Sequence, residues 1–262
     1  MGILNVTPDS FSDGGLYRDC RSAIEQGLAL ATAGADLVDI GGESTRPGAK
    51  SPGIAEELDR VMPVLEGLRS ASDILISVDT SEPAVMAAAV AAGADMLNDV
   101  RALGRPGALS AAAAAGVPVC LMHMQGTPAT MQREPHYQDV VGEVLAFLLE
   151  RVAACVVAGL PRASLILDPG FGFGKTLAHN LALLQHLDEL VATGLPVLAG
   201  LSRKALIGQL AGEPGGVPGD RLGGSVALAL VARARGARIV RVHDVAATVQ
   251  AFRVMDGLES RS

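Results

Sequence analysis

The stretch Ala33-Gly34-Ala35-Asp36-Leu37-Val38-Asp39-Ile40 joins the end of a helix-like run to a short apolar run, and this joint recurs along the chain. Glycine at a helix end tolerates the left-handed backbone that terminates the helix. Similar joints with glycine at the second position lie at residues 92–95, 115–118, 158–161, 193–196 and 235–238. Their recurrence indicates a repeated helix-to-strand unit.

Short apolar runs suited to buried parallel strands lie at residues 2–4, 37–40, 74–78, 96–97, 117–122, 165–167, 197–199 and 239–242. The stretches between them have helical spacing, as in Ile24, Leu28 and Ala31. Strands that alternate with helices over 262 residues favour a (β/α)8 TIM barrel, which usually needs about 250 residues. We therefore expect one α/β barrel domain over residues 1–262. A doubly wound open sheet is the alternative, because periodicity does not show closure.

The composition narrows the class of protein. The formal charge of -7 argues against a nucleic-acid partner, because binding along a duplex requires a basic face. The three cysteines lie far apart, which indicates neither a disulfide framework nor a zinc site. The longest charge-free stretch, residues 106–122, is broken by Gly116 and Pro118, so it fits a helix followed by a strand rather than a membrane span. No secretory signal precedes Asn5. We expect a cytoplasmic protein without a membrane partner.

Polar residues follow nearly every apolar run. The parallel strands of a barrel end on one rim, where the active sites of this fold lie. Capping of the next helix is the alternative role for Asp and Asn here. Thr80 and Ser81 already supply helix-start chemistry after Asp79, and Asp168 precedes Pro169 rather than a helix. The run ends also carry Asp39, His123, Lys204 and His243, but the residues that we expect to form a shared polar site are Asn5, Asp79, Asn98 and Asp168.

The glycine-rich segment at residues 168–176 is similar to a phosphate-binding loop but lacks one required residue. That motif needs glycine where Pro169 stands, so we reject a nucleotide triphosphatase. The glycines can instead let the backbone approach a flat ligand, with Phe173 as a stacking face. A tight surface turn with Phe171 or Phe173 beneath it is the alternative.

Several motifs together resemble the dihydropteroate synthase family. The most specific are MGILNVTPDSFSDGG at residues 1–15 and DIGGESTRPG at residues 39–48. The others lie at residues 77–80, 121–124, 168–175, 202–204 and 241–244. The resemblance implies a TIM barrel that condenses 6-hydroxymethyl-7,8-dihydropterin pyrophosphate with 4-aminobenzoate in folate biosynthesis. It also implies a homodimer and a target of sulfonamides, which imitate 4-aminobenzoate.

The resemblance implies which residues bind the pterin and what each of them does. Asp168 matches the acid that accepts hydrogen bonds from the amino-pyrimidine edge, and Asn98 a second contact to that edge. Asp79 matches the carboxylate that stabilises a cation as pyrophosphate leaves in an SN1-like substitution. With Asp79, Lys204 and Asp13 are the implied catalytic residues. The implied pterin contacts are Thr45, Asp79, Asn98, Met122, Asp168, Phe173, Gly200 and Lys204.

The other substrate groups are assigned in the same way. Asn5 and Asp13 match the ligands of Mg²⁺, a cation that takes few protein ligands and keeps water and phosphate oxygens. The implied pyrophosphate contacts are Asn5, Thr45, Arg46, Arg241 and His243. The implied 4-aminobenzoate contacts are Phe11, Ser12, Pro47, Ser202 and Lys204. One departure is Ala205, where some relatives have serine, so a hydroxyl contact to the benzoate is missing.

Two alternative functions remain open. A pterin-dependent methyltransferase shares the barrel and the pterin edge but does not need the anion set of Asn5, Arg46, Arg241 and His243. A catalytically silent pterin-binding paralogue would not need intact loops with Phe11, Asp13, Arg46 and Pro47. Turnover with both substrates distinguishes these alternatives from a synthase.

Overall fold

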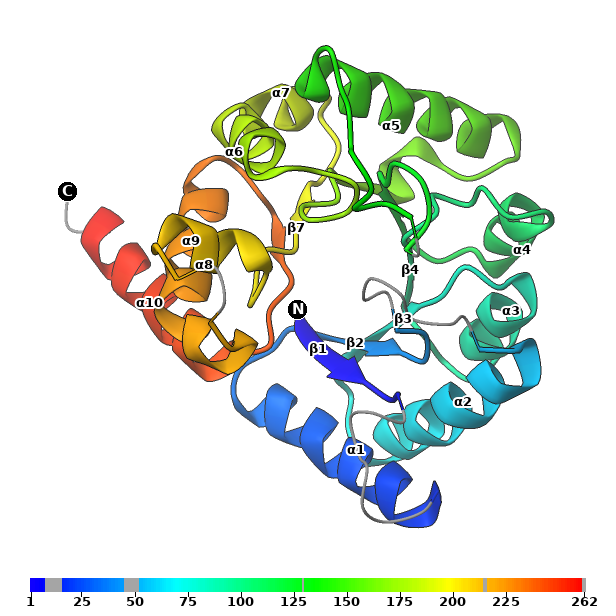
Figure 1. The fold of residues 1–262 in the computed structure, drawn as a ribbon. Helices are drawn as coiled ribbons and strands as arrows, with labels where there is room; N and C mark the ends of the chain where they lie inside the picture. The colour runs from blue at the N-terminus through cyan, green and yellow to red at the C-terminus, as the bar shows by residue number, and fades with distance from the viewer. Residues whose placement is uncertain (8–15, 45–51, 129, 214–215, 261–262) are drawn as a thin grey trace.

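The computed structural model describes residues 1–7, 16–44, 52–128, 130–213 and 216–260, which form eight parallel strands inside a ring of helices (Figure 1). The strands are β1 Gly2–Asn5, β2 Leu37–Gly41, β3 Leu75–Asp79, β4 Met96–Asp99, β5 Val119–Met122, β6 Leu165–Asp168, β7 Leu198–Ala199 and β8 Ile239–Val240. The helices are α1 Leu16–Thr32, α2 Ile54–Ala71, α3 Pro83–Ala91, α4 Ala108–Ala115, α5 Val140–Val157, α6 Leu177–Gln185, α7 Leu187–Val191, α8 Ala205–Leu210, α9 Leu222–Ala234 and α10 Val245–Glu259, with short 3₁₀ turns at Arg162–Ser164 and Pro218–Arg221. In the described part of the chain, no helix has the length and apolar character to cross a membrane.

The strands close into a barrel. β1 to β6 form one sheet in sequence order, and β7 pairs with β8. Two parallel bridges join these sheets, one between Leu167 and Val197 and one between Gly2 and Val242. The amide of Ile3 also donates to the carbonyl of Val242 at 3.0 Å, and that of Leu167 to Pro196 at 2.9 Å. The prediction of a closed barrel is confirmed, and the alternative of an open sheet is wrong.

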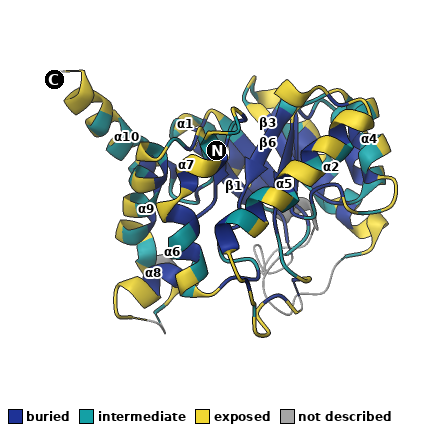
Figure 2. Cartoon of the chain, turned by 90° about the horizontal axis from the view of Figure 1, so that it is seen from above, coloured by how far each residue is buried: buried dark blue, intermediate teal, exposed yellow. Residues whose placement is uncertain are grey.

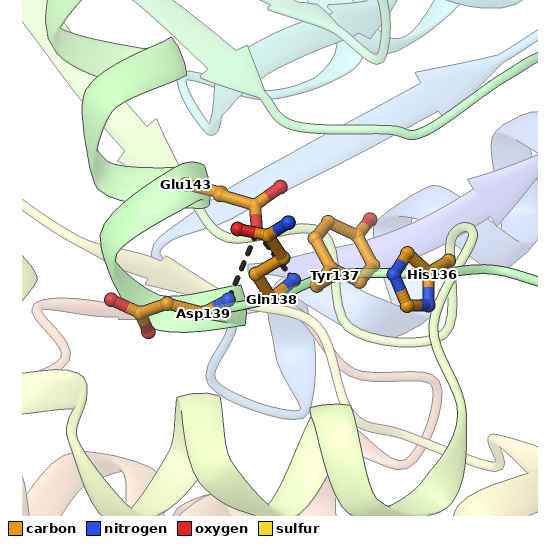
Figure 3. Close-up of a pocket in the computed structure, with 5 residues that line it drawn as sticks. All are labelled: His136, Tyr137, Gln138, Asp139 and Glu143. Carbon is orange, nitrogen blue, oxygen red and sulfur yellow. Dashed lines mark hydrogen bonds between the residues drawn. The ribbon is translucent and has the colours of Figure 1, made fainter.

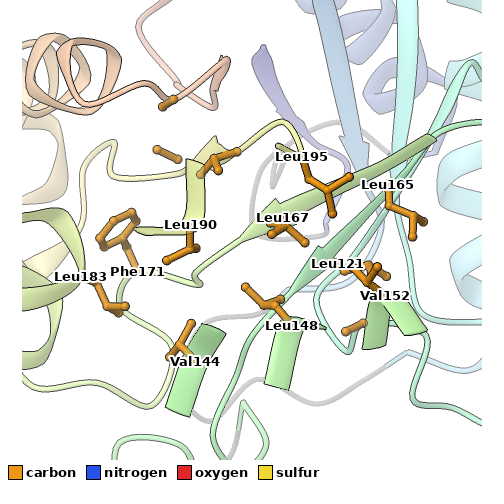
Figure 4. Close-up of a cluster of buried hydrophobic side chains, with 14 of the residues drawn as sticks. Leu121, Val144, Leu148, Val152, Leu165, Leu167, Phe171, Leu183, Leu190 and Leu195 are labelled. Carbon is orange, nitrogen blue, oxygen red and sulfur yellow. The ribbon is translucent and has the colours of Figure 1, made fainter. Parts of the chain in front are cut away.

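The outward faces of the strands pack against the helices. Figure 4 shows Leu121, Leu165 and Leu167 of two neighbouring strands facing the α5 side chains of Val144 and Leu148. Figure 2 shows the strands in the dark blue of buried residues, while exposed residues lie on the outer faces of the helices. Aliphatic side chains dominate this layer, as expected for a chain with 3% aromatic residues.

The inward faces change from apolar to polar along the barrel axis. An apolar cluster of Met96, Cys120, Ile166 and Leu198 fills the centre, with Leu37 and Ile239 packed against it. Side chains alternate along a strand, so the next inward residue lies two positions further on. Those residues are Asp39, Asn98, Met122, Asp168, Gly200 and Arg241. The alternation therefore places a polar layer directly above an apolar one.

Some strand boundaries differ from the predicted ones. β5 begins at Val119 instead of residue 117, since Pro118 has no amide hydrogen to donate to a ladder. β8 ends at Val240 although the apolar run continues to Val242, whose amide bonds instead to the carbonyl of Met1 at 2.9 Å. The last strand thus passes from one sheet to the other at this point.

Candidate active site

The predicted site residues within the described part of the chain lie at the C-terminal ends of the strands. They are Asn5, Asp79, Asn98, Met122, Asp168, Phe173, Gly200, Ser202, Lys204, Arg241 and His243. Six others, Phe11, Ser12, Asp13, Thr45, Arg46 and Pro47, lie outside the described residues. Several residues of the first group contact one another.

A buried cluster of two carboxylates and a guanidinium joins three strand ends. Arg241 Nε donates to Asp39 Oδ2 at 2.6 Å, and Arg241 Nη2 donates to Asp79 Oδ2 at 3.2 Å. Asn98 Nδ2 donates to the same Asp39 oxygen at 3.1 Å. The side chain of Asp39 is 0% exposed, so it fixes both Arg241 and Asn98 from within the barrel. These hydrogen bonds therefore fix the orientation of the Asn98 and Arg241 side chains within the polar layer.

This cluster has one more carboxylate than cations. Burial and the nearby Asp39 charge raise the pKa of Asp79 to about 8. Burial works against the charge of Arg241, but Asp39 and Asp79 outweigh that effect and raise its pKa. A cation placed beside Asp79 would favour its ionised form.

A second unit lies across the barrel end around Asp168. The amide of Gly170 donates to Asp168 Oδ1 at 2.7 Å. Burial raises the pKa of Asp168, while Lys204 opposes that rise. Lys204 Nζ lies 4.7 Å from the centroid of the Phe173 ring and donates to the carbonyl of Phe171. Burial lowers the pKa of Lys204 to about 8. This unit offers an acceptor edge and a cation next to an aromatic face.

Two glycines leave space between these units. A Cβ on Gly200 would lie 3.9 Å from Arg241 Cβ and 4.0 Å from Lys204 Nζ. A Cβ on Gly41 would lie 3.6 Å from Asn5 Oδ1 and 3.9 Å from Asp79 Oδ2. Side chains here would reduce the space between the charged groups. Met122 pairs in register with Asp168 and places an apolar side chain beside it.

The strand ends of β7 and β8 contribute a further contact. Ser202 Oγ lies 3.0 Å from His243 Nδ1 and accepts from the His243 amide at 3.2 Å. Burial, together with Arg203 and Arg241, lowers the pKa of His243 to about 4. Arg203 forms a two-point ion pair with Asp244 at 2.6 and 3.0 Å. His243 is thus neutral near neutral pH and fixed by the turn that carries Lys204.

Oxygen donors at the barrel end determine which metal ion the site suits. No group of three or more His, Cys, Asp or Glu residues that could hold a metal occurs within the described ranges. The Asn5 amide oxygen and the Asp79 carboxylate both face the space left by Gly41. Hard oxygen donors in such small number suit Mg²⁺, which retains water and phosphate oxygens. The residues present therefore fit a magnesium ion that is bound jointly with a phosphate ligand.

Sequence reasoning assigned no role to several residues that support this site. Asp39 was recognised only as a residue at a strand end, although the alternation of Leu37 and Asp39 would have placed it inside the barrel. Lys175 and His123 form a buried contact, Nζ to Nδ1, at 2.9 Å. The Arg101 and Glu43 side chains pair at two points, 3.0 and 3.1 Å apart. No local motif indicates that last pair, because its partners follow different strands.

A separate pocket lies beside the barrel end. It has a volume of about 390 Å³ and is lined by His136, Tyr137, Gln138, Asp139 and Glu143 (Figure 3). Glu143 Oε1 accepts from the amides of Gln138 and Asp139, which fixes the start of α5. None of the charged cluster residues lines it, so this pocket is distinct from the polar layer.

Known proteins share this sequence and this fold. The family described as pterin binding enzyme matches residues 1–243. The chain is 52% identical to the dihydropteroate synthase of Escherichia coli (strain K12) over 256 residues, which cover 98% of this chain and 90% of the relative. The structure of Xanthomonas albilineans dihydropteroate synthase with 4-aminobenzoic acid has a TM-score of 0.93 and 56% identity, and covers 99% of this chain and 92% of that chain. The same enzyme in complex with 7,8-dihydropteroate has a TM-score of 0.90 and 53% identity, with 99% and 92% covered.

Proposed function

The chain belongs to the dihydropteroate synthase family of pterin-binding enzymes, and from this we propose how its barrel end carries out the reaction. The protein is a transferase that joins 6-hydroxymethyl-7,8-dihydropterin pyrophosphate to 4-aminobenzoate and releases pyrophosphate, in folate biosynthesis. The observation that carries the assignment of roles is that Arg241 donates to Asp79 on one side, while on the other the charge of Lys204 opposes the rise in the pKa of Asp168. We propose that the pterin ring binds between these two pairs.

The two units suit the two ends of a pterin. Asp168 presents a buried carboxylate to the amino-pyrimidine edge, where it can accept two parallel hydrogen bonds. Asn98 supplies a further contact to that edge, held in orientation by Asp39. Lys204 donates to the ring carbonyl or nitrogen, and Phe173, Met122 and Gly200 contact the flat faces. These roles follow from charge and position along one barrel end.

Asp79 is proposed to stabilise positive charge on the pterin. In an SN1-like substitution the carbon-oxygen bond breaks first, the electron pair leaves with pyrophosphate, and a cation remains on the pterin. A carboxylate already fixed beside Arg241 costs little reorganisation when that charge develops. The amine of 4-aminobenzoate then attacks the carbon and loses a proton. The raised pKa of Asp79 fits a group that becomes fully ionised as the cation forms.

The departing pyrophosphate is proposed to contact Asn5, Arg241 and His243. Arg241 retains donor groups beyond its bonds to the two carboxylates, and its planar fork suits phosphate oxygens. Asn5 would hold Mg²⁺ together with Asp13, and Thr45 and Arg46 would complete the anion site. Bound there, the ion would supply positive charge to the leaving oxygens.

The 4-aminobenzoate site is proposed to lie near the turn at Ser202, Arg203 and Lys204. Phe11, Ser12 and Pro47 would complete it. Ala205 provides no hydroxyl, so contacts to the benzoate carboxylate must come from the other groups of this turn. Sulfonamides that imitate 4-aminobenzoate are expected to compete for the same position.

We further propose a cytoplasmic homodimer in which residues 1–262 form one domain. The neighbouring helices α9 and α10 carry exposed apolar side chains, among them Val254 at 61% and Leu258 at 69% exposed. We expect Val254→Glu to shift the mass measured by light scattering from dimer to monomer. Val157, 90% exposed on α5 across the barrel, supplies the control variant Val157→Glu, which should leave the mass unchanged. A wild-type monomer at micromolar concentration would contradict the dimer.

The function is tested by pyrophosphate release with both substrates. We expect release to require 4-aminobenzoate and dihydropteroate to form in equal amount. Asp79→Asn keeps the shape of the side chain and removes its charge, so it should lower turnover about 100-fold or more through lost electrostatic stabilisation. Asp73, which is exposed before β3, provides the control Asp73→Asn with wild-type turnover. Release without 4-aminobenzoate, or pterin binding with no turnover, would contradict a synthase.

A further inference from the structure

Lys175, next to the end of the glycine-rich segment at residues 168–176, points into the protein instead of toward a phosphate. Its side chain is only 4% exposed. The ammonium nitrogen donates to the carbonyl of Phe173 at 3.0 Å and to that of His123 at 3.4 Å, and lies 2.9 Å from His123 Nδ1. An ammonium has three hydrogens, so each of them has an acceptor. The lysine that made the segment similar to a nucleotide-binding loop thus serves a different purpose.

These contacts fix the segment that carries the aromatic face of the pocket. Lys175 holds the Phe173 backbone at one side, while the Phe173 ring lies under Lys204 Nζ. Lys204 in turn donates to the carbonyl of Phe171. The two lysines therefore hold the same segment from opposite sides, one from beneath and one from the pocket.

Neutral side chains also hold the glycine-rich segment, two of them from the chain after β5 and one from α6. Tyr137 Oη donates to the carbonyl of Gly174 at 2.9 Å, and Gln132 Nε2 donates to that of Gly172 at 2.7 Å. The amide of Gly172 donates to Asn180 Oδ1 at 2.7 Å. Two carbonyls and one amide, all on Gly172 and Gly174, are thus anchored by side chains. Lys175 adds the buried positive charge of this set.

We propose that Lys175 is a positioning residue for the pterin half of the site, acting through Phe173 and His123 and never touching substrate. This rests on the pterin site proposed above. The three bonds of Lys175 tie the glycine-rich segment after β6 to the end of β5, so that Phe173 and Lys204 keep their places relative to Asp168.

The electrostatics of the contact agree with this geometry. Burial, together with Lys175, lowers the pKa of His123 to about 3, so His123 stays neutral. A neutral imidazole protonated on Nε2 accepts at Nδ1, as the 2.9 Å contact requires. Burial lowers the pKa of Lys175 to about 7, while Asp168 opposes that change and Lys204 adds to it. In its protonated form Lys175 places positive charge near the Asp168 carboxylate and opposes the rise in the pKa of Asp168.

The test compares Lys175→Met with the wild type. Methionine fills similar volume without donors, so we expect KM for the pterin pyrophosphate to rise about tenfold or more, while KM for 4-aminobenzoate changes less. The matched control is Arg69→Met, since Arg69 donates to the carbonyls of Gly93 and Ile74 at the opposite end of the barrel. The control should lower the melting temperature and leave both KM values unchanged. A Lys175→Met enzyme with the wild-type pterin KM would overturn the proposal.

A second pair of variants tests the acceptor side. His123→Asn replaces Nδ1 by an amide oxygen that can still accept from Lys175, so it should keep most of the wild-type pterin affinity. His123→Leu has no acceptor and should weaken pterin binding. Equal pterin affinity in both variants, measured by calorimetry on folded protein, would overturn the role of this contact. Failure of the proposed function is distinguishable, because the wild type would then show no turnover with both substrates, whereas failure of the Lys175 proposal leaves wild-type turnover intact.

Discussion

Arg241 Nε donates to Asp39 Oδ2 at 2.6 Å, a bond between residues 202 positions apart in the sequence. It joins the last strand of the barrel to the second. Because Asp39 also accepts from Asn98, a single buried oxygen orients a guanidinium and an amide that are proposed to contact different parts of one substrate. The relative position of these two groups depends on Asp39.

Replacing Asp39 should damage both stability and activity. Asp39→Ala leaves the Arg241 charge with Asp79 as its remaining carboxylate contact, and breaking a buried pair costs about 3 kcal/mol or more. We expect a lower unfolding free energy in urea and a loss of turnover. Asp36 is exposed at the other end of β2, so Asp36→Ala is the control and should stay within about 0.5 kcal/mol. An Asp39→Ala enzyme with normal turnover would contradict the orienting role.

Lys204→Ala should separate activity from stability. The variant removes a buried ammonium whose pKa burial lowers to about 8, so little folding free energy is lost. We expect kcat/KM for the pterin substrate to fall about 100-fold or more while the melting temperature stays near the wild-type value. The exposed Arg238 at the opposite end of the barrel gives the control Arg238→Ala. An unaltered rate would overturn the role of Lys204.

Gly170 should tolerate no side chain. Its φ is +68° and a Cβ would overlap the His123 carbonyl oxygen, so backbone strain and a collision combine. Gly116 also has φ +68°, but a Cβ there would meet no atom within 4 Å. We expect Gly116→Ala to cost about 1 kcal/mol of unfolding free energy from strain alone, and Gly170→Ala clearly more. Equal losses would show that the close approach to His123 has no energetic weight.

His123 should make the fold less stable in mild acid. Its pKa is lowered from 6.5 to about 3 on folding, first by burial, so the unfolded chain binds more protons between these values. The stability that His123 contributes is present above pH 6.5 and is lost as the pH falls toward 3. From about pH 7 to about pH 5, the wild type should lose about 1 to 2 kcal/mol more than His123→Asn. Parallel pH profiles of unfolding free energy would contradict this.

Removal of divalent metal should stop turnover. We expect EDTA to abolish pyrophosphate release and added Mg²⁺ to restore it. Asn5→Ala should raise the Mg²⁺ concentration required, because one of few protein oxygens is lost. The exposed Gln26 on α1 gives the control Gln26→Ala, with the wild-type requirement. Full activity in EDTA would contradict the metal.

The fold and the strand-end residues could be predicted because both depend on local pattern. Glycine joints mark where helices end, and the two-residue period of strands places Asp168 above Ile166. The contacts that hold these strand-end residues in place could not be predicted in the same way. Lys175 looks like a phosphate ligand in sequence, and its inward direction depends on the left-handed turns at Gly172 and Gly174 and on the position of His123. The partner of Asp39 depends on closure of the barrel, which no local pattern reports.

The two-residue strands β7 and β8 have a consequence for how the barrel opens. They join the six-stranded sheet through isolated bridges at Leu167 and Gly2, whereas neighbouring strands among β1 to β6 pair over three to five residues. Amide protons along β7 and β8 should therefore exchange with deuterium earlier than those of β2 or β3. Since Lys204, Arg241 and His243 follow these two strands, local unfolding would remove these three side chains from the proposed site while its carboxylates on β3 and β6 remain folded.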